Sequence, residues 1–241
     1  MAETRKIAWK RLAIEATAIV VSILLAFAID AWWEERRERQ AEVVLLERLR
    51  TDFIEIHAAL AVVEEEHRAA NKACLFLMSV AVGDTLPAAP GVDRMVALVF
   101  LASRTFNAGS GAFAAFSGGD SSRLIRNQSL AYKLLAWPGL VEELQEEESN
   151  LQKGVAERWT PYLASRASLG PYVAALGEPM HAMPSHVSMP TVRPPLTVDA
   201  DFLNHVLDRF KWQQIALRDI APVRVAMEEI LRLLESELEA R

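Results

Sequence analysis

The most distinctive cluster of metal-binding residue types lies between Pro179 and Pro190. It holds three methionines and two histidines: Met180, His181, Met183, His186 and Met189. Thioether and imidazole groups are ligands that suit Cu(I), so these five residues are a candidate metal site. The alternative is a proline-broken loop whose methionines pack on the rest of the protein, because six of the 11 prolines fall in residues 171–195. We favour this second interpretation and expect no cofactor.

Two arginines, Arg123 and Arg126, follow the glycine-rich stretch Ser117-Gly118-Gly119. Guanidinium groups bind anions, so both arginines are candidate anion-binding residues. Ordinary ion pairing is the alternative. No Gly-Lys-Ser/Thr, nucleophile elbow or His-Glu-x-x-His occurs in the sequence. We therefore expect no catalytic residues and no enzyme activity.

The single cysteine, Cys74, excludes an internal disulfide and a cysteine metal cluster. It falls on a repeating apolar seam, which predicts a buried packing residue; an intermolecular disulfide is the alternative. The net charge of −6, without a basic and aromatic-rich surface pattern beyond the N-terminal residues, argues against nucleic-acid binding.

The element that opens the chain is a long helix, because the first 82 residues contain neither glycine nor proline. Within it, residues 12–33 carry only two charges. At 1.5 Å per residue they span about 33 Å, enough for a hydrocarbon core of about 30 Å. We predict a short basic tail over 1–11, a transmembrane helix over 12–33 and a helical domain over 34–241. The alternatives are a signal peptide cleaved after Ala26-Phe27-Ala28 and a buried core helix.

Residues at both ends of this span are typical of a membrane interface: Trp9, Arg11, Glu15, Asp30, Trp32 and Trp33. Four basic residues precede the span, whereas charges balance after it. This pattern favours a cytoplasmic N-terminus and a periplasmic domain in a bacterial inner membrane. Ala18, Ser22 and Ala26 form a ridge of small residues, a candidate surface for helix association and thus for a homo-oligomer.

Two long seams of three- and four-residue steps follow. The first contains Leu46, Leu49, Phe53, Ile56, Leu60, Val63, His67, Ala70, Cys74 and Leu77. The second contains Val206, Phe210, Gln213, Leu217, Ile220, Arg224, Met227, Leu231, Leu234 and Leu238. Such seams are typical of coiled-coil or bundle helices, and these two predict an antiparallel pair. Pro222 predicts either a kinked helix or two helices.

Shorter elements lie between the seams. We expect helices over 93–104, over 130–137 where Pro138 ends the helix, and over 141–164. An irregular, proline-rich loop is expected over about 165–198. No useful β-alternation occurs, so the predicted fold is all-α: an N-terminal transmembrane helix continuing into a long helix, then a bundle of four or five helices.

The N-terminal third resembles a bacterial family of uncharacterised single-pass membrane proteins. The resemblance rests on Ala13-Ile14-Glu15 before the apolar span, on the exit Asp30-Ala31-Trp32-Trp33-Glu34-Glu35-Arg36-Arg37, and on Leu46-x-x-Leu49-x-x-Asp52-Phe53. Ser117 to Asn127 is similar to a central motif of that family, with an insertion. The resemblance implies an uncleaved membrane anchor and no catalytic residues.

These patterns together favour a membrane-anchored interaction or scaffold module. Its expected partners are lipid, a second copy of the chain and another envelope protein. The alternative functions are a ligand- or metal-binding, sensor-like helical domain that uses the central loops and, third, an enzyme of unknown class.

Overall fold

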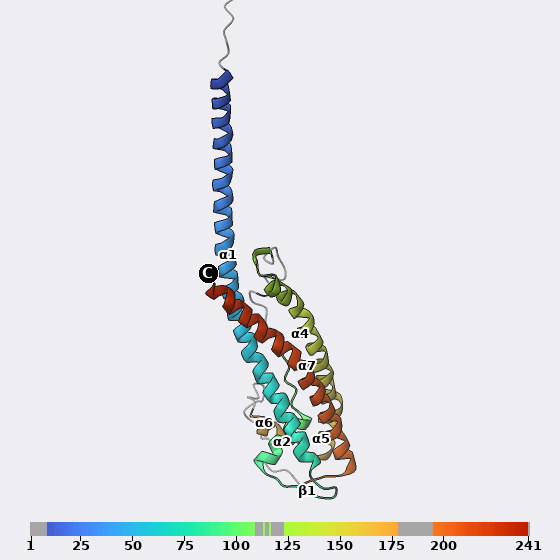
Figure 1. Ribbon diagram of the computed structural model, residues 1–241. Coiled ribbons are helices and arrows are strands. Elements are labelled where there is room, and N and C mark those ends of the chain that lie inside the picture. The colour runs from blue at the N-terminus through green and yellow to red at the C-terminus, as the bar shows by residue number, and fades with distance from the viewer. Residues whose placement is uncertain (1–8, 109–112, 114–115, 117–122, 178–194, 241) are drawn as a thin grey trace, which may run out of the picture.

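The computed structural model describes residues 9–108, 113, 116, 123–177 and 195–240. In these ranges the chain is all-α, as the sequence predicts, apart from one pair of two-residue strands. The longest helix opens the chain, and the second longest closes it (Figure 1). The described elements form an elongated bundle from which the first part of the N-terminal helix projects.

Helix α1 runs without interruption over Trp9–Met78. Its 70 residues correspond to about 105 Å at 1.5 Å per residue. Every described side chain up to Ala41 is exposed, and Glu42 is the first buried residue. The projecting part includes a window that is long and apolar enough to cross a membrane, and none of that window is buried in the protein.

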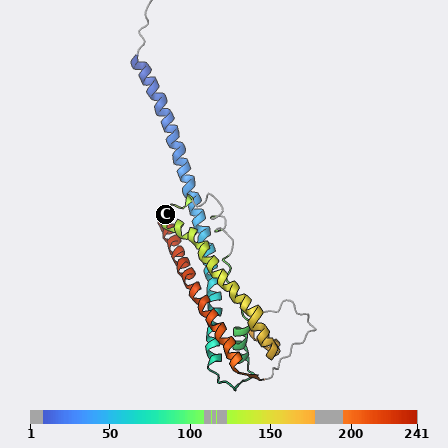
Figure 2. The same ribbon diagram turned by 90° about the vertical axis from the view of Figure 1, so that its right-hand side faces the viewer.

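The seam predicted on α1 is confirmed, because all ten of its residues are buried. Helix α7, Ala200–Glu239, lies antiparallel to this part of α1 (Figures 1 and 2). It continues through Pro222, whose side chain is exposed. The C-terminal end of α7 therefore lies beside α1 where α1 leaves the bundle (Figure 1).

The seam predicted on α7 is correct for half of its residues. Val206, Gln213, Ile220, Met227 and Leu234 are buried as predicted. The alternate positions are one residue earlier than predicted: Arg209, Ala216, Val223 and Ile230 are buried, whereas Phe210, Leu217, Arg224 and Leu231 are only partly so. Both sets satisfy three- and four-residue spacing, so spacing alone does not separate them.

The third long rod consists of α4 (Gln128–Gly154), the π-helical turn η2 (Val155–Trp159) and α5 (Thr160–Arg166). Asn127 caps it by accepting a hydrogen bond from the Leu130 backbone N–H at 3.0 Å. The prediction that Pro138 ends the helix is wrong. An internal proline costs about 3 kcal/mol, but Leu134, Trp137 and Val141 on both sides of it are buried against the other helices, and this packing offsets the cost.

Short elements close the end of the bundle that lies farthest from the projecting part of α1. Helix α2 covers Pro90–Phe100 and α6 covers Gly170–Leu176. Strand β1 (Thr85–Leu86) pairs antiparallel with β2 (Leu196–Thr197), with Thr85 opposite Thr197. The range expected to be an irregular loop, about 165–198, thus contains α6 and β2.

The interior divides into two apolar clusters. The cluster nearer the projecting helix contains Leu49, Phe53, Trp137 and Met227 among others. The far cluster includes Cys74, Phe100, Trp159 and Phe202. α1, α7 and the α4–α5 rod contribute to both, and polar residues lie between them.

The π-helical turn brings the Trp159 ring over Gly154, which is five residues earlier. A Cβ atom added to Gly154 would lie 2.6 Å from two carbons of this ring. Trp159 is fully buried in the far apolar cluster, so its ring can move away only by displacing its neighbours. Gly139, in the same helix, has no heavy atom within 4 Å of an added Cβ.

Gly154→Ala is therefore expected to lower the free energy of unfolding by about 1–3 kcal/mol, because it overpacks the core. The matched variant Gly139→Ala should raise the free energy of unfolding by about 0.4–1 kcal/mol, because alanine reduces the conformational entropy of the unfolded chain. Urea unfolding of the detergent-solubilised full chain, followed by circular dichroism, measures both. Equal shifts for the two variants would contradict the packing at Trp159.

Candidate functional site

A layer of buried polar side chains lies between the two apolar clusters. His67 comes from α1, Glu148 from α4 and Gln213 from α7, and all three are at most 4% exposed. The His67 Nε2 atom lies 3.7 Å from Glu148 Oε1, too far for a hydrogen bond but within ion-pair range. Glu148 Oε2 accepts a hydrogen bond from the Phe106 backbone N–H at 2.7 Å. The layer thus ties three long helices to the segment after α2.

Gln213 links this layer to a buried arginine. The surrounding groups favour one orientation of its amide, in which the oxygen accepts from Arg209 at 2.9 and 3.1 Å and the nitrogen donates to His67 Nδ1 at 2.8 Å. Since Nδ1 then accepts, the imidazole proton is on Nε2 and faces Glu148. Arg209 also donates to the Ala102 carbonyl at 2.6 Å.

Arg209 is a cation inside the apolar core, with 1% of its surface exposed. Burial lowers its pKa to about 10, so the guanidinium is still charged at neutral pH. The guanidinium carbon lies 4.7 Å from the centre of the Trp159 ring, which provides a cation–π contact. The ring and the two oxygen acceptors compensate the desolvated charge in part.

Cys74 is fully buried in the far cluster. Burial raises the pKa of its thiol to about 12, although the nearby Arg209 charge opposes this shift. The thiol is therefore protonated at neutral pH and packs as a small apolar side chain.

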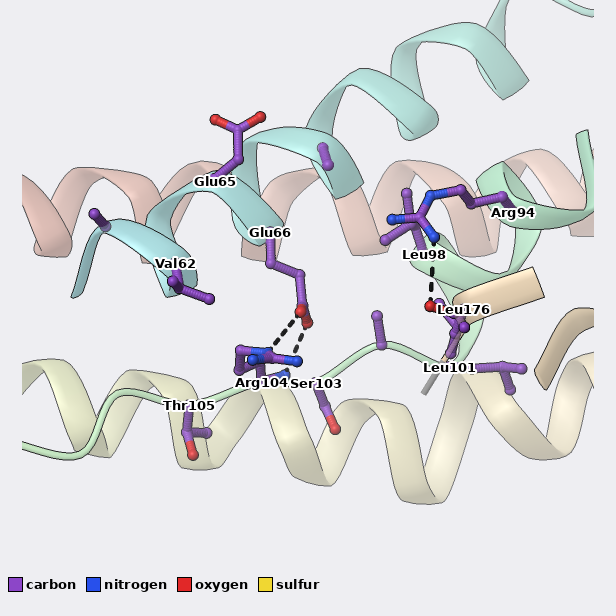
Figure 3. A pocket seen from close by; sticks show the side chains of 14 residues that line it. Val62, Glu65, Glu66, Arg94, Leu98, Leu101, Ser103, Arg104, Thr105 and Leu176 are labelled. Carbon is purple, nitrogen blue, oxygen red and sulfur yellow. Dashed lines mark hydrogen bonds and ion pairs between the residues drawn. The ribbon is translucent and has the colours of Figure 1, made fainter. Parts of the chain in front are cut away.

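A cleft of about 1110 Å³ opens on the surface beside this layer (Figure 3). Its walls come from α1, α2, the segment 101–105 and the end of α6. On one side Glu66 accepts from the Arg104 side chain at 2.8 Å and from its backbone N–H at 3.2 Å. On the other side Arg94 donates to the Ala175 and Leu176 carbonyls at 3.2 and 3.4 Å.

The cleft joins charged rims to an apolar wall, a combination that suits a small amphipathic ligand. Leu98, Leu101 and Ala102 line it, and Ala102 is the residue whose carbonyl Arg209 binds from inside. Its hydroxyl groups, Ser103 and Thr105, have no histidine beside them among the residues that line the cleft. No group of three or more His, Cys, Asp or Glu in the described part of the chain could hold a metal ion.

The candidate metal residues, Met180, His181, Met183, His186 and Met189, all lie outside the described residues. The same is true of Ser117-Gly118-Gly119. Metal binding by the methionine- and histidine-rich segment therefore stays a prediction.

The six residues predicted at a membrane interface all belong to α1. The side chains of Trp9, Glu15, Asp30, Trp32 and Trp33 are exposed, and that of Arg11 is outside the described set. Ala18, Ser22 and Ala26 are exposed on the same helix, and the Ser22 hydroxyl donates to the Ala18 carbonyl at 2.8 Å. The Trp32 and Trp33 rings pack edge to face, 5.2 Å apart.

The two candidate anion-binding arginines differ in their positions. Arg126 lines a second cleft with Arg36 and Arg39 of α1, whereas Arg123 is not among the residues that line it. The Arg126 backbone N–H donates to Glu42 Oε1 at 2.9 Å, and its side chain lies 3.7 Å from Glu35 and from Glu42. Arg126 thus stands where α1 enters the bundle.

Sequence reasoning missed Glu148 as a member of the polar layer and missed the buried Arg209 to which Gln213 links it. His67 and Gln213 lie on predicted seams, and a polar residue at a seam position was the available signal. Glu148 belongs to an acidic helix face and gives no such signal.

No family model, curated protein or solved structure matches this chain. The similarity to a family of single-pass membrane proteins therefore stays an expectation drawn from the residues quoted above.

Glu148→Ala should lower the free energy of unfolding by about 1–3 kcal/mol, because it leaves the buried Phe106 N–H without an acceptor and removes the carboxylate that lies 3.7 Å from His67 Nε2. Glu146→Ala, an exposed acid on the same helix, should change it by no more than about 0.5 kcal/mol. Urea unfolding of the full chain compares them. A Glu148→Ala variant as stable as Glu146→Ala would show that the layer does not stabilise the bundle.

Proposed function

We propose that this chain is a single-pass membrane-anchored protein whose helical bundle acts as an interaction or scaffold module of a bacterial envelope. The supporting observation is the projecting part of α1. Its described side chains are exposed from Trp9 to Ala41, and its apolar window has no protein partner in the described chain. A contiguous apolar surface of this size in water is unfavourable, and hydrocarbon is the solvent that suits it.

The continuity of α1 supports the scaffold role. The helix passes from the apolar window into the bundle without a break, and α7 packs along its second half. The bundle is therefore held at a fixed distance and direction from the anchor. Exposed apolar side chains on the bundle, among them Val62, Tyr132, Leu135 and Leu207, offer contacts for a partner.

The proposed orientation follows the charge asymmetry around the span. We assign the N-terminus to the cytoplasm and the bundle to the periplasm. The proposed partners are lipid, a second copy of the chain and a further envelope protein.

Two matched substitutions test the anchor. Ile23 is 50% exposed and Val62 is 52% exposed, and both belong to α1. An arginine at the centre of a membrane span costs about 3 kcal/mol on insertion scales. Ile23→Arg should therefore reduce the carbonate-resistant membrane fraction several-fold and reduce crosslinking of the bundle to partners in native membranes, whereas Val62→Arg should leave the membrane fraction unchanged.

Unmodified chain in the soluble fraction after carbonate extraction would contradict the anchor. So would an Ile23→Arg variant that is retained in the membrane as well as Val62→Arg. If the integrated protein forms no crosslinked species from any exposed bundle position, the scaffold role is wrong and the anchor is retained.

A second candidate function rests on the cleft of Figure 3. Its apolar wall and charged rims favour a ligand-binding, sensor-like domain that uses segment 101–105. Ligand occupancy would reach the polar layer through Ala102, because Arg209 binds the Ala102 carbonyl.

A further inference from the structure

A second cleft, of about 960 Å³, lies where α1 leaves the bundle. Its lining includes three arginines and one carboxylate: Arg36, Arg39, Arg126 and Glu237. Val43 and Val44 add an apolar part. The cleft thus combines cationic donors with an apolar surface.

The carboxylates around this cleft already have partners. Glu35 pairs with Arg39 and lies 3.7 Å from Arg126, and these two arginines lower the pKa of Glu35. Glu42 accepts from the Arg126 backbone N–H, and Glu237 accepts from the Asn127 amide at 2.7 Å. These contacts hold two of the three arginines in place.

Arg36 is the exception. Its guanidinium carbon lies 5.8 Å from the centre of the Trp32 ring, and no carboxylate pairs with it among the described residues. This cation–π contact with Trp32 occupies the face of the guanidinium and not its N–H donors. A charged group held over an aromatic face, without a counter-ion, is suited to bind an anion.

The position of the cleft along α1 indicates which anion it would meet in a membrane. Arg36 and Arg39 are three and six residues beyond Trp33, about 4.5 and 9 Å at 1.5 Å per residue. If Trp32 and Trp33 lie at the edge of the hydrocarbon, Arg36 falls in the headgroup layer, which is about 5–8 Å thick on each side, and Arg39 lies just beyond it, with its long side chain within reach. Lipid phosphates lie at that depth.

We infer that this cleft binds the phosphate group of an anionic phospholipid, with Arg36 as the main ligand and Arg39 and Arg126 beside it. The inference rests on the proposed membrane anchor. It extends that proposal by naming a lipid class and a site. A bound headgroup would link α1, the Arg126 segment and the C-terminal end of α7 at the membrane surface.

Arg37 provides a matched control. It is one residue from Arg36, carries the same charge at nearly the same depth, and does not line the cleft. The full chain, Arg36→Gln and Arg37→Gln are reconstituted in nanodiscs of phosphatidylcholine with increasing phosphatidylglycerol. Native mass spectrometry then counts the phosphatidylglycerol molecules retained by the protein.

Arg36→Gln should weaken phosphatidylglycerol retention at least about fivefold, because it removes a positioned, charge-assisted contact to the lipid phosphate. Arg37→Gln should change it less than twofold, and 10 mM inorganic phosphate should not compete. Equal losses in both variants, or no loss in either, would overturn the site. Displacement of the lipid by inorganic phosphate in an Arg36-dependent manner would overturn the lipid assignment in favour of soluble phosphate.

The same samples separate this inference from the proposed anchor. Unmodified protein that fails to enter the nanodiscs contradicts the anchor itself. Protein that enters them with no preference for phosphatidylglycerol over phosphatidylcholine contradicts the phosphate site alone.

Discussion

The packing of α7 along the second half of α1 is the interaction on which the rest of the structure depends. It buries ten consecutive seam residues of α1, from Leu46 to Leu77, and returns the end of the chain to the point where α1 leaves the bundle. The α4–α5 rod then completes both apolar clusters. Because α1 is unbroken, the same packing that stabilises the bundle also fixes its direction relative to the projecting apolar part of the helix. One continuous helix thus provides both the projecting apolar segment and a principal rod of the bundle.

The buried polar layer gives this bundle a defined register. Apolar seams with three- and four-residue spacing tolerate a shift of one repeat, whereas the Gln213–His67 hydrogen bond and the approach of His67 to Glu148 occur in only one alignment of their helices. Arg209 of α7 donates a hydrogen bond to the Ala102 carbonyl and so fixes the segment after α2 against the same helices. Ala102, whose carbonyl accepts from Arg209, also lines the cleft of Figure 3. This residue connects the packing of the core to the second candidate function.

The long helices were predictable from the sequence. The burial of single residues and the positions of the clefts were not, because they depend on residues that are distant in the chain. The α1 seam was correct throughout because it is apolar with one polar exception. On α7, hydrophobicity favoured Phe210 over Arg209, yet Arg209 is buried because Ala102 and Trp159, far away in the chain, compensate its charge. Pro138 was expected to end a helix because proline has no backbone N–H and clashes with the preceding turn. In the structure α4 continues past Pro138, because residues on both sides of it pack in the core. The cleft at Arg36 needs α1, Arg126 and the end of α7 together, and only Arg126 was singled out from sequence.

The central claim is that α1 couples its projecting apolar segment, the proposed anchor, rigidly to the bundle. The most direct test is the distance between spin labels at Leu24, in the apolar window, and at Arg48, in the bundle, measured by pulsed electron spin resonance in nanodiscs. Both side chains are exposed, and the buried Cys74 does not compete for the label. A continuous helix places the two Cα atoms about 36 Å apart, and we predict one narrow distribution near that value, allowing for the label linkers. A broad distribution, or one centred well below this distance, would mean that α1 bends or breaks between Trp33 and Glu42 and would contradict the account.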